Sequence, residues 1–207
     1  MVTGRIHAQR SSMSPTSKSY VSIQLPLGGH SFSGAELEKI APAESCNVVA
    51  ILPTAKCVAV PQEVFKGEEC EAYLAASGIT LDSNECAVHS NTSHPVVAVM
   101  AIDKACHKLL TERYGKQISY TTPLLITPMP EQGSVLHLAE GVLYIRVANE
   151  GLRLAEVVAA ANDGDILYFL EHTHRVFNIY NMYARAEGDT QRLMSICKKL
   201  FTNIVCE

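Results

Sequence analysis

The chain has 207 residues, of which 47% are hydrophobic and 18% are charged. A chain of this length can bury one large core or two small ones, and its composition is that of a globular protein and not of a disordered one. The formal net charge is -4, so no overall basic field indicates binding to nucleic acid or to an anionic membrane.

Seven cysteines are present, and no two of them have the C-x-x-C spacing of a metal or redox site. Most lie within apolar runs, as reduced and buried thiols do. A disulfide framework would be unusual in a chain of this length. We therefore expect reduced cysteines, no bound metal and a cytoplasmic location.

The N-terminal residues 1–19 contain Arg5, Arg10 and Lys18 but no apolar run that could form the core of a signal peptide. We expect this segment to be a disordered leader. A charge-free stretch at residues 87–102 is interrupted by His89 and Pro95, so it does not predict a membrane span.

The first half predicts a mixture of strands and helices. Residues 20–27 alternate between apolar and polar side chains, which indicates a strand. Gly28 and Gly29 can supply the positive φ angles of a hairpin turn, after which residues 30–33 begin a return strand. Further strands are predicted over residues 46–52, 57–60 and 95–102, and helices over residues 61–65 and 68–77 and from Asp103 to about residue 115.

The second half contains a clearer hairpin. Residues 142–148 form the outgoing strand, residues 149–151 the turn and residues 152–160 the return strand. A long helix follows, whose acidic first turn at Asp163 and Asp165 suits the helix dipole. Short extended segments are predicted over residues 118–120, 124–127 and 135–138, a last helix from about residue 190, and a final strand at residues 204–205.

The two halves share one pattern. Residues 20–32 and residues 143–154 both read as strand, glycine turn and strand, and each is followed later by an amphipathic helix. Two similar halves of the type β-β-β-α-β-α would be expected of a duplicated fold.

The order of residues resembles an uncharacterised bacterial domain-of-unknown-function family with the actin-like fold shared by sugar kinases, actin and the large heat-shock chaperones. The segments that carry the resemblance are structural and not catalytic, and they span nearly the whole chain from residue 20. They are residues 21–25, 29–32, 60–65, 71–74, 122–125 and 165–169.

The resemblance implies an α/β (α+β) fold, a duplicated actin-like ATPase fold of two ribonuclease H-like lobes with mixed sheets. The expected domains are the leader at residues 1–19, a first lobe at residues 20–116 and a second lobe at residues 117–207. The chain departs from the family after Ser33, where only residues 34–44 precede the next strand. We therefore expect the first lobe to be abbreviated.

Catalysis in actin-like ATPases depends on two aspartates. One glycine-turn hairpin from each lobe holds phosphate, and an aspartate on each hairpin positions magnesium and the attacking water. Residues 22–33 contain no acidic residue, and the second hairpin has Arg146 where an acid is expected and Glu150 in its turn. We therefore predict that the chain has no catalytic residue and does not hydrolyse ATP.

Binding of ATP and magnesium without hydrolysis stays open, because the backbone amides of glycine turns can hold a phosphate. The alternative interpretation is that these segments are ordinary turns and a helix cap. His172 and His174 lie about 200° apart around their helix, so they cannot chelate one metal ion together. The residues that would contact a nucleotide are Gly28, Gly29, Ser31, Asn149, Gly151, Gly188 and Asp189.

Two main hypotheses follow. The first is a non-catalytic interaction or scaffold module that binds a protein partner or a second copy of itself. The second is a nucleotide-binding sensor or weak kinase-like enzyme that uses the cleft between the lobes. The resemblance also implies a third possibility, a link to ribosome maturation through a protein partner. The first hypothesis predicts a protein partner or self-association, with no nucleic acid and no membrane span.

Overall fold

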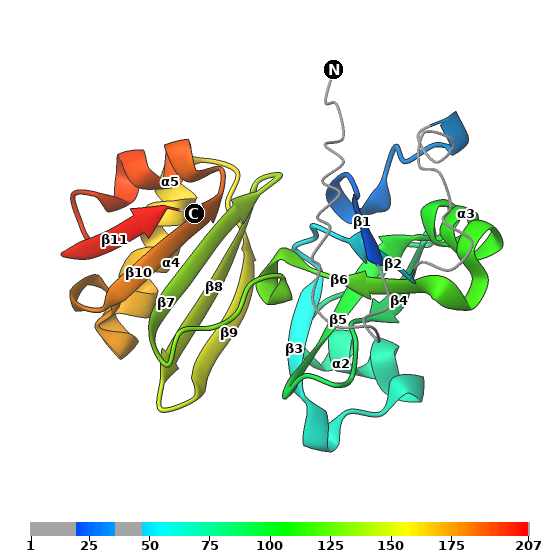
Figure 1. The fold of residues 1–207 in the computed structure, drawn as a ribbon, viewed down its shortest axis with the longest axis horizontal. Coiled ribbons are helices and arrows are strands. Elements are labelled where there is room, and N and C mark those ends of the chain that lie inside the picture. The colour runs from blue at the N-terminus through cyan, green and yellow to red at the C-terminus, as the bar shows by residue number, and fades with distance from the viewer. Residues whose placement is uncertain (1–19, 36–46, 207) are drawn as a thin grey trace, which may run out of the picture. The chain divides into compact units, whose positions relative to one another are not determined.

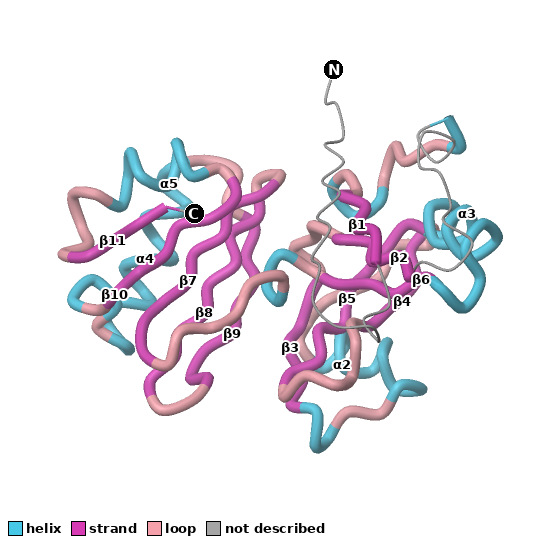
Figure 2. Tube along the Cα trace, viewed as in Figure 1, coloured by secondary structure: helices cyan, strands magenta, loops and turns pink. Residues whose placement is uncertain are grey.

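The structure is a computed structural model that describes residues 20–35 and 47–206 and is drawn in Figures 1 and 2. The chain divides into two compact units, one ending at Thr122 and the other beginning at Pro123. The predicted leader lies outside the described residues. So does most of the segment, residues 34–44, on which the prediction of an abbreviated first lobe rests.

The first unit alternates strands with helices. Short 3-10 helices lie at Leu27–Gly29 (η1), Gln62–Val64 (η2), Gly67–Glu69 (η3) and Gly115–Gln117 (η4). The described strands and α-helices are β1 (Tyr20–Gln24), β2 (Asn47–Ile51), β3 (Cys57–Pro61), α2 (Cys70–Ala76), β4 (Glu85–His89), β5 (Val96–Asp103), α3 (Lys104–Tyr114) and β6 (Ile118–Thr121).

Two three-stranded sheets form the described part of this unit. In one sheet β1 and β6 lie parallel to the central strand β2, and in the other β3 and β4 lie antiparallel to the central strand β5. A parallel bridge between Ser90 and Tyr120 joins the end of β4 to β6. Leu74 of α2 packs in a core cluster with Val60 and Val99, which places α2 on the antiparallel sheet.

The predicted apolar strand and the helix after it are confirmed. β5 is buried on both faces, since every residue from Val97 to Ile102 is fully buried. Asp103 begins α3 as its N-cap, and its Oδ1 accepts hydrogen bonds from the backbone N–H groups of Ala105 at 2.9 Å and Cys106 at 3.0 Å. These bonds satisfy donors that have no partner within the helix.

The predicted hairpin at Gly28 and Gly29 is wrong. Both glycines have positive φ angles, of 61° and 77°, but they belong to η1, and residues 30–33 form no strand. The chain instead follows β2 in parallel, since the Leu25 N–H donates to the Ile51 carbonyl at 2.9 Å. The strand partner of β1 is therefore β2. The two glycines indicate a turn, but they do not indicate which strand pairs with β1.

The two compact units divide between Thr122 and Pro123. The reason is β6, whose residues from Ile118 to Thr121 pair in parallel with Val48 to Ile51 of β2. These residues therefore belong to the first sheet, although they follow α3 after only one short 3-10 helix.

The second unit contains one five-stranded sheet and two α-helices within its described residues. 3-10 helices lie at Pro123–Leu125 (η5) and Ile179–Asn181 (η6). The other elements are β7 (Gln132–Ala139), β8 (Val142–Asn149), β9 (Leu152–Ala159), α4 (Asp163–Phe177), β10 (Tyr183–Gly188), α5 (Thr190–Cys197) and β11 (Asn203–Cys206).

The strand order of this sheet is β11-β10-β7-β8-β9. The strands β7, β8 and β9 form an antiparallel meander. β10 then pairs in parallel with the other side of β7, and β11 pairs in parallel with β10. β7 is therefore the central strand, with an antiparallel neighbour on one side and a parallel neighbour on the other (Figure 1).

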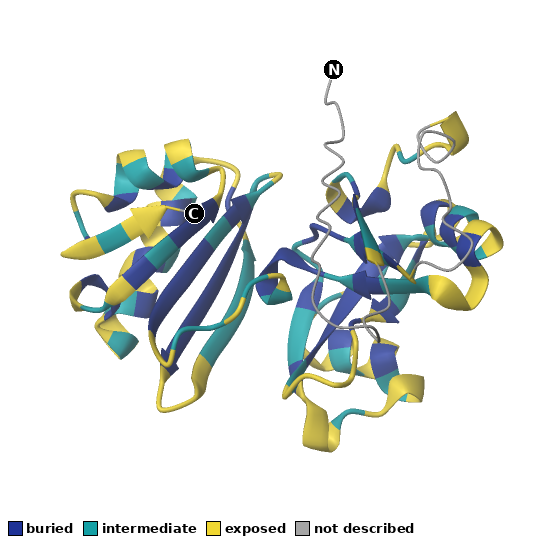
Figure 3. Cartoon of the chain, in the orientation of Figure 1, coloured by how far each residue is buried: buried dark blue, intermediate teal, exposed yellow. Residues whose placement is uncertain are grey.

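Both helices pack on one face of the sheet. The core there joins alternate strand residues, such as Leu136 and Ile145, to Ile166 and Leu170 of α4 and Leu193 of α5. Figure 3 shows that burial is most continuous in β7 and β8. α4 begins with a capping box, in which the side chains of Asn162 and Asp165 each accept from the backbone N–H of the other residue.

The prediction for the second unit was correct for the hairpin of β8 and β9, for both helices and for the final strand. It missed β10, whose sequence Tyr-Ala-Arg-Ala-Glu-Gly is poor in β-branched residues. β10 is a strand because its alanines at 184 and 186 are fully buried in the core while its charged residues face the other way. Among the described residues, no helix is long and apolar enough to span a membrane.

Gly188 ends β10 in a position that excludes any side chain. Its φ is 74°, and a Cβ built there would lie 2.2 Å from the Leu138 carbonyl oxygen and 2.9 Å from the His137 ring. Gly141 has the same φ of 74° but would meet only an ordinary contact, at 3.9 Å. The two positions therefore form a matched pair.

We predict that Gly188→Ala lowers the free energy of unfolding by about 3 kcal/mol or more, because the positive φ and the clash both act. Gly141→Ala serves as the control and should cost only about 1–2 kcal/mol for the positive φ. Urea titration, monitored by circular dichroism, measures the free energy of unfolding of both variants. Equal losses for the two variants would contradict the close approach of β10 to β7.

Candidate functional site

The glycine amides that could hold phosphate in the first unit are bonded within the protein. The Gly28 N–H donates to the Pro53 carbonyl at 2.8 Å, and the Gly29 N–H donates to the Pro26 carbonyl at 2.9 Å. Gly29 is also closely packed, since a Cβ there would lie 3.1 Å from the Cys106 side chain. A phosphate could use these two amides only by displacing carbonyls that already accept from them. Ser31, with a φ of 68°, is exposed beside this turn.

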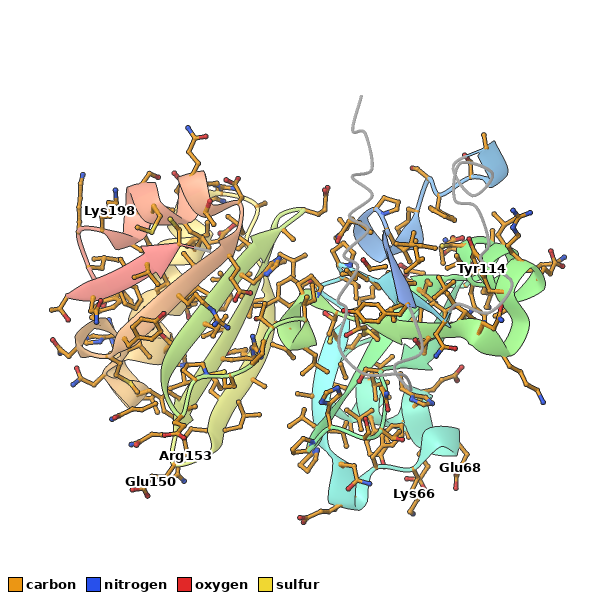
Figure 4. All side chains as sticks on the ribbon, in the orientation of Figure 1. Lys66, Glu68, Tyr114, Glu150, Arg153 and Lys198 are labelled. Carbon is orange, nitrogen blue, oxygen red and sulfur yellow. The ribbon has the colours of Figure 1, made fainter. Side chains whose placement is uncertain are left out.

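Asn149 and Gly151 form the turn between β8 and β9. The Asn149 N–H donates to the Gly151 carbonyl at 2.9 Å, and the Asn149 carbonyl accepts from Arg153 Nε at 2.8 Å. Figure 4 shows Glu150 and Arg153 at this tip. These contacts are those of a closed hairpin turn.

Gly188 and Asp189 link β10 to α5. Asp189 is the N-cap of α5, and its Oδ1 accepts from the Arg192 N–H at 3.1 Å, while its own N–H donates to the Leu138 carbonyl at 2.8 Å. Both residues therefore have a structural role as a strand end and a helix cap.

The predicted nucleotide residues of the second unit do not lie together. Asn149 pairs with Gln132 at one end of β7, whereas Gly188 pairs with Leu138 at the other end. These register positions are about 20 Å apart at roughly 3.3 Å per residue. The hairpin turn and the strand end therefore cannot contact the same phosphate.

A group of ionisable residues that were not among the predicted site residues lies on the sheet face opposite α4 and α5. Its members are His137 of β7, Arg146 of β8, and Arg185 and Glu187 of β10, and together with Thr127 they are called the sheet-face cluster. Glu187 and Arg146 are only 4% and 6% exposed. The register places these strands side by side, because Glu187 pairs directly with His137.

Every oxygen of Glu187 has a partner within this cluster. Oε1 accepts from Arg185 Nε at 2.7 Å, and Oε2 accepts from Thr127 Oγ1 at 3.0 Å and from His137 Nδ1 at 3.2 Å. An ionised carboxylate can only accept hydrogen bonds, so Nδ1 is the protonated nitrogen of His137. Each oxygen of the carboxylate thus has at least one partner within the protein.

Residues 123–131, called the strap, cross this face of the sheet before β7 begins. η5 in the strap contacts β7, β8 and β9. Arg146 donates to the Thr127 carbonyl and to Thr127 Oγ1, each at 2.8 Å, and Arg185 Nη2 donates to the Pro128 carbonyl at 2.6 Å. Both arginines therefore fasten the strap to the sheet.

The pKa values of the cluster reflect its burial and its pairing. Burial alone would raise the pKa of Glu187, but the hydrogen bonds from His137 and Thr127 and the charge of Arg185 outweigh it, so this pKa lies below its usual value. Burial lowers the pKa of Arg146 to about 10, although the nearby charge of Glu187 opposes this shift. Both groups are charged at neutral pH.

The first unit has a smaller polar group near the glycine turn. Lys56 Nζ binds Glu85, which is buried, and Asp82 at 2.8 Å. His30 Nδ1 lies 3.6 Å from Asp103 Oδ2, and Asp103 is already the N-cap of α3. The hydrogen bonds that Lys56 donates to Asp82 and Glu85 raise the pKa of Lys56. Acids do come near the turn in space, but each has a partner in the protein.

Neither group is arranged to hold a metal. Among residues 20–35 and 47–206, no three His, Cys, Asp or Glu side chains are placed so that they could bind one ion. Magnesium prefers carboxylate oxygens that are open to it and to water. Glu187 is the one acid of the sheet-face cluster, and its oxygens are occupied.

The sequence contained one signal for this cluster. Arg146 interrupts an apolar run, at the position where an acid was expected. His137 between two leucines and Glu187 between Ala186 and Gly188 are similar interruptions. A search for single polar residues inside predicted apolar strands would have found Arg146 and His137, but not Glu187, because β10 was not predicted as a strand.

We predict that Glu187→Gln lowers the free energy of unfolding by about 2–4 kcal/mol at neutral pH, because the buried Arg146 and the partly buried Arg185 lose their counter-charge. The folded pKa of Glu187 is depressed, so its contribution is present above the unfolded pKa and is lost as pH falls through the folded pKa. The difference between the variant and the wild type should therefore shrink as the pH falls through the depressed folded pKa of Glu187.

Urea titrations at several pH values provide the measurement for this prediction. Glu156→Gln, on the edge strand β9, is the control and should change stability by less than about 0.5 kcal/mol. A pH-independent difference for Glu187→Gln would contradict the ionised, paired state of this carboxylate.

Comparisons with known proteins identify the fold. No protein-family model matches the chain, and no functionally curated protein matches its sequence. A solved structure from Bacteroides thetaiotaomicron VPI-5482, a protein with actin-like ATPase fold and unknown function, is similar with a TM-score of 0.64 and 16% identity over 78% of this chain and 68% of that one.

The cytoplasmic domain of EpsL, an inner membrane component of the type II secretion system of Vibrio cholerae, matches with a TM-score of 0.40 and 17% identity over 80% of this chain and 66% of that one. The first likeness is the one that bears on the fold. The chain therefore has the actin-like ATPase fold that the resemblance implied.

Proposed function

We propose that this chain is a non-catalytic protein of the actin-like fold that acts by binding a protein. The observation that carries the proposal is that both carboxylate oxygens of Glu187 accept hydrogen bonds from protein groups. Phosphoryl transfer relies on positioned metal ions and open acidic groups. Here the buried acid on the central strands accepts from Arg185, Thr127 and His137.

Conversion of this cluster to a magnesium site would be costly. The metal would have to displace Arg185 and the strap from Glu187, which would leave buried charges and hydrogen-bond donors without partners. Arg146 and Arg185 would also repel the ion. The glycine amides support the same conclusion, because those of Gly28 and Gly29 donate to protein carbonyls.

Several finer features belong to this proposal. The meander followed by two parallel strands supports a ribonuclease H-like description of the second unit. The leader at residues 1–19 and two lobes, the first of them abbreviated, are retained as proposed domains, and we take the boundary between the lobes after residue 122 instead of residue 116. The net charge of -4 favours a protein partner over nucleic acid.

Thiol chemistry supports a cytoplasmic location. Cys57, Cys70, Cys106 and Cys197 are buried, and burial raises the pKa of Cys57 and that of Cys197 to about 12. Such thiols react slowly and suit a reducing compartment.

The test is titration calorimetry of the purified protein with ATP and magnesium up to millimolar nucleotide. We expect no saturable heat. Saturation with a dissociation constant tighter than about 1 mM, equivalent to roughly 4 kcal/mol of binding, would overturn the proposal in favour of a nucleotide sensor. In that case Gly28→Ala and Gly151→Ala would show which unit contributes the phosphate contacts, with Gly78→Ala as a control at a positive-φ glycine that has no neighbour within 4 Å.

A further inference from the structure

α4 presents a second apolar surface that the core does not use. Its inner side buries Ile166, Leu170 and Thr173. Its outer side exposes Tyr168 and Val176 at 66% and 65% of their surface. Single exposed apolar residues are common on proteins, but two large ones on the same helix are a candidate contact surface.

Charged residues lie between these two apolar side chains. Tyr168, Glu171 and Arg175 recur at spacings of three and four, so they lie along one face of the helix. All three are exposed, as is His172. The Glu171 side chain contacts the Tyr180 hydroxyl only weakly, at 3.4 Å. We call the exposed face formed by Tyr168, Glu171, His172, Arg175 and Val176 the α4 outer face.

The charges of α4 are ordered along its axis. The first turn contains Asp163 and Asp165, and the last turn contains His174 and Arg175. Asp163 already pairs with Arg192 of α5 at 2.7 Å, and His174 stacks on Tyr180, so Asp165 and Arg175 supply the charges for a partner. Two copies of such a helix are complementary when they run antiparallel, because each acidic end meets a basic end and the helix dipoles oppose each other. A two-fold contact of this kind uses the same surface twice.

We propose that the α4 outer face binds the α4 outer face of a second copy, antiparallel and about a two-fold axis near the middle of the helix. Arg175 of the second copy then lies over the Tyr168 ring and beside Glu171, one turn away on the same face. The symmetric contact repeats the cation–π interaction and the ion pair. The inference rests on the proposed function, for which it names the protein that is bound.

The size of the surface sets the expected strength. α4 has 15 residues, which makes it about 22 Å long. One helix pair buries less than the roughly 800 Å² per partner of a standard stable interface. We therefore expect a weak, reversible dimer with a dissociation constant of about 10–500 μM, a range typical of small interfaces.

Sedimentation equilibrium of the whole chain, up to about 1 mM protein, tests the contact. We expect Tyr168→Ser and Val176→Ser each to weaken dimerisation, and the double variant to weaken it by at least about tenfold, since central aromatic contacts dominate such interfaces. Val64→Ser is the matched control, because Val64 is 60% exposed but lies in η2 of the first unit. Circular dichroism verifies that each variant is folded.

A charge exchange provides the sharper test. Glu171→Arg and Arg175→Glu should each weaken the dimer about fivefold or more, and the variant that carries both should be closer to the wild type, because the pair is rebuilt between copies. A wild type that stays monomeric at about 1 mM overturns the inference, as does a dimer that the α4 variants leave unchanged. Neither result alters the nucleotide titration, so the two proposals can fail separately.

Discussion

Glu187 carries a negative charge inside the second unit, and the surrounding elements are arranged so that this charge is matched. Arg185 comes from the same strand, His137 from the central strand β7, and Thr127 from the strap. Arg146 completes the arrangement from β8 by holding the strap through Thr127. The parallel pairing of β10 with β7 and the course of the strap therefore share one electrostatic constraint.

This constraint also bears on function. A fold does not determine an activity, and activity depends on groups that are available to a substrate. Three described acids already interact with protein groups. Glu187 accepts from Arg185, Glu85 pairs with Lys56, and Asp103 caps the N-terminus of α3. The α4 outer face, which we propose as a contact surface, suits a macromolecular partner better than a small ligand.

The sequence predicted elements with strong local patterns. The apolar β5, the hairpin of β8 and β9 and the capped helix α4 all follow from periodicity and from turn or cap residues. β10 was missed because its burial depends on neighbours that the local pattern does not encode. The glycine turn after β1 was correctly assigned positive φ angles. The strand that pairs with β1 was not correctly predicted, because parallel pairing joins segments that are distant in sequence.

The same reason limited the prediction of the site. The predicted nucleotide residues were chosen as turns, and the register of β7 separates Asn149 from Gly188. The sheet-face cluster is formed by residues that are distant in sequence, since His137 and Glu187 are 50 positions apart. No spacing rule within one element brings such residues together.

The separation between β7 and β10 also has a consequence for the order in which the second unit folds. The meander of β7, β8 and β9 is made of contacts between neighbours in sequence, which close quickly. β10 pairs with β7 although β8, β9 and α4 lie between them in sequence. Closing this long loop costs more conformational entropy. We expect the meander to form first and the cluster to lose its water last, so changes in the cluster should act mainly on the rate of unfolding, as a denaturant chevron would show.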